Sequence, residues 1–451
     1  MTAQSYPASL PRYESAPIDV SVLAESIKMP FSGKVAKNRF LKASMAEIQA
    51  TWDQHDPSNR GIVTGNLVRL YTAFGAGGFG IILTGNLQVD PYNLSGPGDM
   101  ILAKDLLNNG RLEEFKKLVN AAKAHGSLFY AQISHAGRQT PAHVQPNPVS
   151  ASSIKLDDRM GMSFAQPKEL SVEEIKAIVQ RFADTAEIVS QAGADGVQLH
   201  GAHGYLLAQF LASTTNKRTD QYGGSLENRS RIIVEIIEAI KARVPTLSIA
   251  LKLNAVEFQS GGFTTEDCAA LSTKLESLGV DWIELSGGTY EDMRMTPDEE
   301  EQKRESTKRR EAFFLKFAEM IRPSLQKTRV YVTGGFRTAE GMVRAIENGS
   351  TEGIGLARPV AEEPDLPNKI LSGEASAAIK TLVPANDSGL GGAVGGLAMK
   401  QIGDGQSVIL DSSNPEHMQK VYQTLQAYQT ATMENAKQGI VKAGWPELVL
   451  A

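Results

Sequence analysis

The clearest structural signal in the chain is GVQLHGAHGYLLAQFLASTTNKRTDQYGGSLENRSRIIVEIIEAIKAR, residues 196–243. It opens with a short apolar run of strand length, Gly196–His200, and closes with Leu226–Arg243, in which isoleucines recur at helical spacing. A strand followed by an amphipathic helix is the repeating unit of a parallel sheet covered by helices. The segment therefore predicts one βα unit.

The same pattern recurs along most of the chain. The predicted strands are 39–45, 79–85, 128–133, 196–200, 248–254, 282–286, 330–333 and 353–356. The predicted helices are 66–75, 111–125, 172–192, 226–243, 265–278, 312–322 and 338–348, with an eighth from about 367. Eight consecutive units predict an α/β fold of the TIM (β/α)8 barrel type, and a doubly wound sheet with so many regular units is less favoured.

The two ends of the chain differ from the repeating part. The segment IKMPFSGKVAKNRF, residues 27–40, predicts a hairpin with Ser32 and Gly33 at its tip, capping the bottom of the barrel. Residues 381–405 contain seven glycines and indicate a flexible or irregular connection, followed by a helix over 415–437. We expect residues 1–380 to form the capped barrel, and 381–451 to be an extension that packs on the barrel or on a neighbouring subunit.

Composition limits the function. The 451 residues are 41% hydrophobic and 22% charged, as in an ordinary globular protein. A net charge of −5 gives no electrostatic reason to expect nucleic acid or an anionic membrane as a partner. The single cysteine, Cys268, excludes an intramolecular disulfide and a cysteine-held metal cluster within this chain. Without a signal-peptide pattern or a long apolar run, the default expectation is a cytoplasmic protein.

Polar residues at the carboxyl ends of barrel strands have the strongest claim to catalysis. His200 and His203 follow the fourth strand, and Tyr205 comes two residues later. Two neutral imidazoles can donate N–H bonds to one carbonyl oxygen, while a phenol supplies a proton from another side. The alternative is a buried pair with satisfied hydrogen bonds, and zinc is less favoured because two histidines do not complete a site.

The seventh and eighth strands end in TGGFR and GLARP. Their glycines allow close backbone approach, and Arg358 adds a positive charge where barrels commonly bind phosphate. We interpret these two strand ends as a phosphate site. A Gly pair alone would indicate only a tight turn.

Lys252 and Gln132, near the ends of the fifth and third strands, are predicted to point into the barrel. The lysine has three candidate roles, which the residues alone leave open: a Schiff-base nucleophile of an aldolase, a counter-charge for an anionic cofactor, or an internal salt-bridge partner. His135 and Arg138 either line the pocket or stabilise the structure.

Taken together, these motifs resemble the old yellow enzyme family of FMN-dependent oxidoreductases. The resemblance covers about residues 20–375. It is carried by KNRFLKASM, GFGIILTGNLQVD, AQISHAGRQ, the long segment from Gly196 to Arg231, and the glycine and arginine segments of strands seven and eight.

The resemblance implies a barrel that binds FMN non-covalently, is reduced by NADH or NADPH, and passes hydride to an electron-poor alkene. His200 and His203 match the pair that binds the substrate carbonyl oxygen, and Tyr205 matches the proton donor. The cofactor-binding positions that match are Ser44, Met45, Gly85, Gln132, Lys252, Gly334, Gly335, Gly355 and Arg358. The implied partner is a small α,β-unsaturated carbonyl compound.

One departure keeps other functions open. Ala46 stands where many relatives have Cys or Thr, and alanine cannot make the hydrogen bond by which that position tunes the flavin potential. An FMN-dependent NAD(P)H oxidase, or a dehydrogenase or isomerase of a specialised biosynthetic intermediate, is therefore the alternative function. TDQYGGSLENR is interpreted as a structural brace of the fourth strand's loop.

Overall fold

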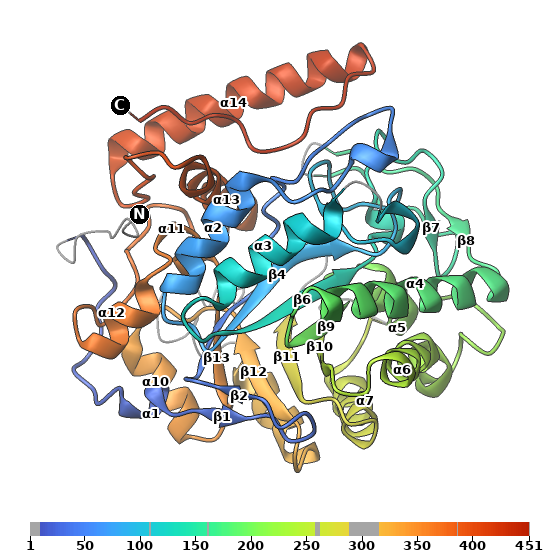
Figure 1. The fold of residues 1–451 in the computed structure, drawn as a ribbon, viewed down its shortest axis with the longest axis horizontal. Helices are drawn as coiled ribbons and strands as arrows, with labels where there is room; N and C mark the ends of the chain where they lie inside the picture. Colours follow the sequence, from blue (N-terminus) through green and yellow to red (C-terminus); the bar gives the residue numbers. More distant parts are fainter. Residues whose placement is uncertain are drawn as a thin grey trace.

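The core of the protein is a closed barrel of eight parallel strands (Figure 1). The computed structural model describes residues 10–107, 110–159, 162–257, 262–287, 315–385 and 387–450. The barrel strands are β3 Phe40–Lys42, β4 Ile81–Gln88, β6 Leu128–Ser134, β9 Gly196–Gly201, β10 Ser248–Val256, β11 Trp282–Gly287, β12 Arg329–Thr333 and β13 Gly353–Leu356. Strand β3 closes the ring by pairing with both β13 and β4. The predicted TIM barrel is confirmed, with β3 ending three residues earlier than expected.

Helices surround this barrel. Those predicted from the sequence are α2 Gly65–Ala76, α3 Arg111–Lys123, α4 Val172–Gln191, α6 Leu226–Arg243, α7 Thr265–Ser277, α10 Ala339–Glu347 and α12 Leu366–Ser372. Of the helix predicted over 312–322, residues 315–321 are helical, and 312–314 lie outside the described residues. Short additional elements are α1 Ser21–Ala24, α5 Leu206–Leu211, α11 Arg358–Glu362, β5 Met100–Ile101, β7 Val149–Ser150 and β8 Lys168–Glu169.

Local signals explain where these helices begin and end. At the start of α4, the Ser171 hydroxyl accepts the Glu174 backbone N–H and the Glu174 carboxylate accepts the Ser171 N–H, a capping box. Gly126 and Gly193 follow α3 and α4 with φ of 80° and 87°, the left-handed conformation that ends helices and favours glycine.

The N-terminal hairpin closes the bottom of the barrel, as predicted. Its strands are β1 Ile27–Lys28 and β2 Val35–Ala36. At the tip, the backbone N–H groups of Phe31 and Ser32 donate to the carboxylate of Asp281, just before β11, at 2.8 and 3.0 Å. The hairpin therefore covers the end of the barrel where the strands begin.

The barrel interior changes from aromatic to polar along the strand direction. Near the bottom, Trp282 packs against Tyr130 and Tyr331, with ring centroids 5.3 and 5.1 Å apart. Two residues further along β6 and β11 come Gln132 and Glu284, both fully buried. Since side chains alternate along a strand, this sequence spacing stacks a polar layer on the aromatic one.

The interpretation of residues 381–405 as an irregular connection is wrong, because helix α13 occupies Ser388–Asp404. Glycine costs a helix roughly 1 kcal/mol relative to alanine, so the sequence argued against it. Tertiary packing outweighs that cost: a Cβ on Gly396 would lie 2.0 Å from the Trp445 ring, and one on Gly403 would lie 2.5 Å from the Gln49 side chain. Only glycine allows α13 to pack this closely.

The C-terminal extension packs on the barrel (Figure 1). Helix α13 contacts α2 and α11, and Asn66 donates to Asp404 at 2.6 Å. The following helix, α14 Pro415–Lys437, lies where it was predicted. An apolar cluster joins α13, α14 and the last residues; its members include Leu397, Leu410, Val421 and Leu448. The extension is thus anchored by its own small core as well as by contacts with α2.

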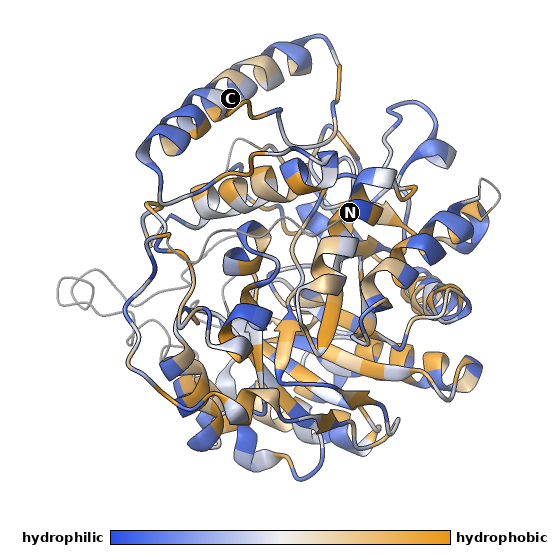
Figure 2. Cartoon of the chain, turned by 60° about the vertical axis from the view of Figure 1, so that its left-hand side comes forward, coloured by the Kyte–Doolittle hydropathy of each residue, from blue (hydrophilic) through white to orange (hydrophobic). Residues whose placement is uncertain are grey.

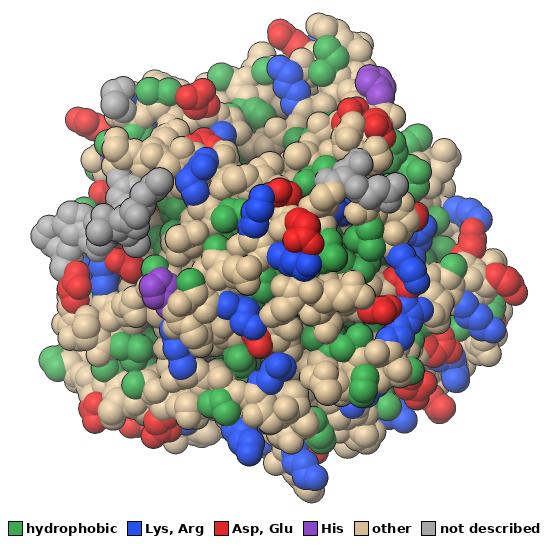
Figure 3. All heavy atoms as spheres, viewed as in Figure 1, with side chains coloured by type: hydrophobic (Ala, Val, Ile, Leu, Met, Phe, Trp, Pro, Cys, Tyr) green, Lys and Arg blue, Asp and Glu red, His purple; other side chains and the backbone are tan. Residues whose placement is uncertain are grey.

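Hydrophobic residues are concentrated on the barrel strands, whereas the outer helices carry hydrophilic residues on one side (Figure 2). On the face drawn in Figure 3, charged side chains of both signs are interspersed. None of the helices in the described part of the chain is long and apolar enough to cross a membrane.

A buried carboxyl group fixes the extension to the barrel and predicts a pH effect. The Ser412 N–H and hydroxyl donate to Glu362 at 2.5 and 2.8 Å, and burial raises the pKa of Glu362 to about 7. Because the folded state then binds this proton more tightly than the unfolded state, stability falls as pH rises from about 4.5 to about 7.

We expect Glu362→Gln to remove this part of the pH dependence, an effect of up to roughly 3 kcal/mol. The measurement is urea unfolding of both proteins at pH 5 and pH 8. The wild type should lose more stability than the variant between the two pH values, and parallel losses would contradict the assignment.

Candidate active site

The turn after β9 brings two imidazoles and a phenol together. His200 ends the inward-facing row of β9, and His203 follows in the left-handed conformation, with φ of 58°. This conformation is strained for a residue other than glycine and is common at functional sites. The His200 ring centroid lies 5.3 Å from that of His203 and 4.5 Å from that of Tyr205. The three predicted residues therefore form one cluster.

Both histidines are held in the neutral form. Burial, reinforced by the neighbouring His203 and Lys252, keeps the pKa of His200 well below its ordinary value. Burial followed by the charge of Lys252 lowers the pKa of His203 to about 3. At neutral pH each ring therefore carries one N–H donor and one acceptor nitrogen.

Neighbouring groups orient the two rings. The Ala202 N–H donates to Nδ1 of His200 at 3.4 Å, which leaves the ring proton on Nε2. For His203, Nε2 lies 3.0 Å from the Ser286 hydroxyl, and the backbone N–H donates to Asn254 at 3.2 Å. Asn254 and Ser286 lie on β10 and β11, so the pair is fixed by three adjacent strands.

Asn86 was not predicted as a site residue, and it contacts the phenol. Its Nδ2 donates to the Tyr205 hydroxyl at 3.2 Å and to the Ser95 hydroxyl at 3.0 Å. Ser95 in turn donates to Asp99 at 2.7 Å. Because the amide donates, the phenol oxygen is the acceptor in this contact, and the phenol proton is directed elsewhere. The only sequence signal for Asn86 was its position at the end of the second strand.

Beneath the histidines, a chain of buried polar side chains crosses the barrel. Ser44 donates to Gln132 at 2.7 Å, Gln132 donates to Gln198 at 2.7 Å, and Gln198 donates to Glu284 at 2.8 Å. Glu284 forms an ion pair with Lys252 at 2.9 Å. Gln132 and Lys252 thus point inward as predicted, whereas Gln198 and Glu284 were missed.

Of the three roles considered for Lys252, the ion pair with Glu284 supports that of an internal salt-bridge partner. An amine engaged with a carboxylate at 2.9 Å inside the barrel is not placed as a free nucleophile, which argues against an aldolase. The side chains of Lys252 and Glu284 are only 4% and 0% exposed. In such surroundings the removal of one partner leaves an uncompensated buried charge.

We expect Lys252→Met to destabilise the FMN-free protein by about 3–5 kcal/mol. In the double variant Lys252→Met/Glu284→Leu both charges are gone, so part of the stability should return. Urea unfolding of the wild type, both single variants and the double variant measures the coupling. Strictly additive losses would show that the two groups do not interact.

Three further predicted residues lie just after β3, where Ser44 and Met45 follow the strand, and within β4, which contains Gly85. Ser44 and Met45 are partly exposed, and Ala46 is exposed. Gly85 approaches them closely, because a Cβ there would lie 2.3 Å from the Met45 carbonyl oxygen and 2.0 Å from the Glu47 carboxylate. The Gly85 N–H donates to Glu47 at 2.8 Å. Met45 and Gly85 therefore lie side by side, at the same end of the barrel as the histidines.

The predicted phosphate residues lie at the ends of β12 and β13. Gly334 and Gly335 have φ of 146° and 81°, which favour glycine. A Cβ on Gly355 would lie 1.8 Å from the Thr333 hydroxyl, a buried oxygen for which the described residues provide no hydrogen-bond partner. A cavity of about 750 Å³, counting its open mouth, is lined by Gly335, Arg337 and Arg358 among others. A backbone that a ligand can approach closely, together with two guanidinium groups, fits an anionic phosphoryl group.

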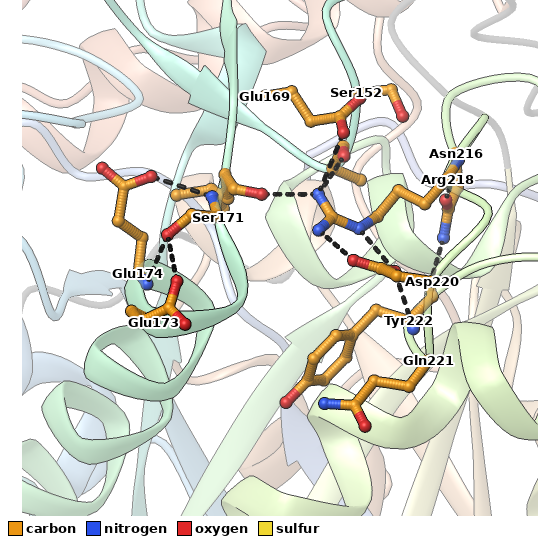
Figure 4. Close-up of polar contacts among 12 residues, drawn as sticks. Ser152, Glu169, Ser171, Glu173, Glu174, Asn216, Arg218, Asp220, Gln221 and Tyr222 are labelled. Atoms are coloured by element: carbon orange, nitrogen blue, oxygen red, sulfur yellow. Dashed lines mark hydrogen bonds and ion pairs between the residues drawn. The ribbon is translucent and has the colours of Figure 1, made fainter.

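The run TDQYGGSLENR, residues 219–229, braces the loop after β9 against α6, as interpreted, because Arg229 of α6 donates to the carbonyl oxygens of Leu211 and Gly224. Residues around the start of this run add further ties. Figure 4 shows the guanidinium of Arg218 facing Asp220, to which it is paired at 2.5 Å. The same group donates to the carbonyl oxygens of Ala151 and Leu170, at 3.0 and 2.6 Å. Asn216 donates to two further carbonyl oxygens of the loop. These bonds tie the β9 loop to the loop before α4.

His135 and Arg138 have structural contacts. Nδ1 of His135 accepts the Gly137 N–H at 3.0 Å, and its carbonyl oxygen accepts the N–H of Leu206 at the start of α5. Arg138 is 1% exposed and donates to the Ile154 carbonyl oxygen at 3.4 Å. Among the described residues, no three His, Cys, Asp or Glu side chains are placed to hold a metal ion.

Comparison with known proteins gives matches over most of the chain. A family model described as the NADH:flavin oxidoreductase / NADH oxidase family matches residues 27–376. The NADH-dependent flavin oxidoreductase nadA of Aspergillus parasiticus is 43% identical over 390 residues, which is 86% of this chain and 87% of that protein.

Solved structures support the fold. A 2-naphthoyl-CoA reductase complex matches with a TM-score of 0.70 and 24% identity, covering 83% of this chain and 59% of that one. The old yellow enzyme homologue of Zymomonas mobilis matches with a TM-score of 0.64 and 22% identity, covering 79% of this chain and 94% of that one.

Proposed function

The chain belongs to the NADH:flavin oxidoreductase / NADH oxidase family, and we propose that it uses FMN and NADH to reduce the activated C=C bond of an α,β-unsaturated carbonyl compound. The resemblance to old yellow enzymes drawn from the sequence is confirmed at the level of the family. The substrate class and the residue roles below are our proposal.

The observation that carries the proposal is the cluster of His200, His203 and Tyr205. The rings of His203 and Tyr205 lie within 5.3 Å of the His200 ring centre. The two neutral imidazoles can donate hydrogen bonds to a carbonyl oxygen, and the phenol can give a proton to carbon. Their neutrality matters, because a neutral N–H can stabilise developing negative charge without transferring its proton.

Bound FMN would supply the hydride chemistry that couples oxidation of NADH to reduction of the alkene at its β-carbon. The Nε2–H of His200 and a ring N–H of His203 would bind the substrate carbonyl oxygen and stabilise the enolate charge that develops as the C=C electron pair shifts. Tyr205 would then give its proton to the α-carbon. Asn86 would position the phenol by donating to its oxygen.

Other residues would hold the cofactor. Gln132 and Lys252 would hold the flavin together with Ser44, Met45 and Gly85. Because Glu284 neutralises part of the lysine charge, the pair would stabilise an anionic reduced flavin less than a lone cation would. Gly334, Gly335, Gly355 and Arg358 would bind the phosphoryl group.

A second candidate is an NADH oxidase, which the family description includes. The specific observation is Ala46, whose methyl group cannot hydrogen-bond to the flavin. A dehydrogenase or isomerase acting on a specialised biosynthetic intermediate would use the same site. In each case the substrate is a small molecule.

Product analysis separates these functions. FMN-loaded protein is mixed with NADH and an α,β-unsaturated ketone, with and without oxygen. We expect the saturated ketone to form without oxygen, in step with NADH consumption, and to form in air faster than oxygen is consumed. Consumption of NADH that requires oxygen and leaves the ketone unchanged would favour the oxidase.

A further inference from the structure

The cavity at the ends of β12 and β13 is enclosed by two parts of the chain that are distant in sequence. From the barrel come Gly335, Arg337 and Arg358, and from the extension come Val383, Gly391 and Ser412. The match to the family model ends at residue 376, so the extension lies beyond it. One side of this cavity is therefore built by residues to which no role has been assigned.

We propose that the C-terminal extension forms the outer wall of the site for the FMN phosphoryl group and holds Arg358 in position for it. The inference rests on the proposed function, since it concerns the binding of the same cofactor. It adds a second part of the chain to the cofactor site.

At Gly391 the extension closely approaches Arg358. A Cβ at this position would lie 2.8 Å from Nη1 of Arg358 and 3.2 Å from its Cδ. Four residues further along α13, a Cβ on Gly395 would lie 3.3 Å from Ala361 of α11. Glycine at these positions lets α13 approach α11 and leaves room for the guanidinium beside the cavity.

The wall is fixed rather than loosely placed. Ser412 donates a hydrogen bond to the buried Glu362, which also lines the cavity. The Ser412 carbonyl oxygen accepts the N–H of Leu382, just before α13, at 2.8 Å. At the C-terminal end of α13, the Arg69 guanidinium donates to the Gly403 carbonyl oxygen at 2.7 Å. A wall anchored at both ends can determine where an arginine side chain lies.

The chemistry of the cavity indicates a phosphoryl ligand. Arg337 and Arg358 both come from the barrel side, and a guanidinium can form two parallel hydrogen bonds to phosphate oxygens. The extension contributes small and apolar groups together with the hydroxyl-bearing Thr381 and Ser412. Its role is thus to confine the ligand and the arginine, and the charge comes from the barrel.

The test is Gly391→Ala, with Gly392→Ala as the matched control. Alanine favours a helix at both positions. The added methyl would displace the flexible end of Arg358 in the first variant, whereas a Cβ on Gly392 would meet nothing within 4 Å. Both variants should fold, and circular dichroism checks this. If Gly391→Ala does not fold, Gly395→Ala is measured instead: its Cβ would press α13 against Ala361 of α11 at 3.3 Å, and FMN binding should weaken while riboflavin binding stays unchanged.

Dissociation constants for FMN and riboflavin are measured by flavin fluorescence with FMN-free protein. We expect Gly391→Ala to weaken FMN binding about tenfold, with riboflavin, which lacks the phosphoryl group, and the Gly392→Ala control unchanged. Equal effects on FMN and riboflavin, or no difference between the two variants, would overturn the inference and leave the proposed function intact. Failure of the unchanged protein to bind FMN would overturn both.

Discussion

Replacing Tyr205 by Phe should slow alkene reduction by ~10²–10⁴-fold, the range typical of one general acid. Reduction of the flavin by NADH should stay nearly unchanged, because only the second half-reaction needs the phenol proton. The two half-reactions are measured separately by anaerobic stopped-flow absorption, first with NADH and then with an α,β-unsaturated ketone.

The control is Tyr428→Phe on α14, which removes a hydroxyl that donates to the Gly444 carbonyl oxygen, far along the chain from the site. This variant should behave as the wild type in both half-reactions. Equal losses of both half-reactions in Tyr205→Phe would mean that the phenol supports the flavin site in general and does not serve as the proton donor.

The second large effect is expected for the histidine pair. The double variant His200→Ala/His203→Ala, which removes both side-chain donors, should weaken the binding of a phenol by ~100-fold or more, since each hydrogen bond to a charged oxygen contributes about 1.5–3 kcal/mol. Phenolic ligands report on the carbonyl pocket in the family that the sequence resembles. Titration of the FMN-loaded protein with a phenol, followed by absorption, gives the dissociation constants.

FMN affinity of the double variant should remain close to that of the wild type, because the pair is assigned to the substrate. His125→Ala, at an exposed position after α3, is the matched control. Unaltered phenol binding in the double variant would place the carbonyl pocket elsewhere in the protein.

The residues that could be predicted from the sequence are those whose arrangement depends on local order. His200, His203 and Tyr205 follow one strand within six residues, so a single turn brings them together. The barrel itself was predictable because eight βα units repeat the same periodicity. The histidine and tyrosine cluster and the order of the barrel elements both follow from residues that are neighbours along the chain.

The residues that were missed depend on contacts between distant segments. Gln198 and Glu284 lie 86 positions apart in the sequence and meet only in the folded barrel, through a hydrogen bond between β9 and β11. Asn86 reaches Tyr205 across 119 positions of sequence. In helix α13, the glycines argue locally against a helix, and the packing of Trp445 and Gln49 that favours it is invisible without the fold.

The central claim is most directly tested by an absorption spectrum of the purified, FMN-loaded protein under anaerobic conditions. We predict that NADH bleaches the visible flavin band and that an α,β-unsaturated ketone restores it, with the saturated ketone as the product. A band that only oxygen restores, or a protein that takes up no FMN, would contradict the account.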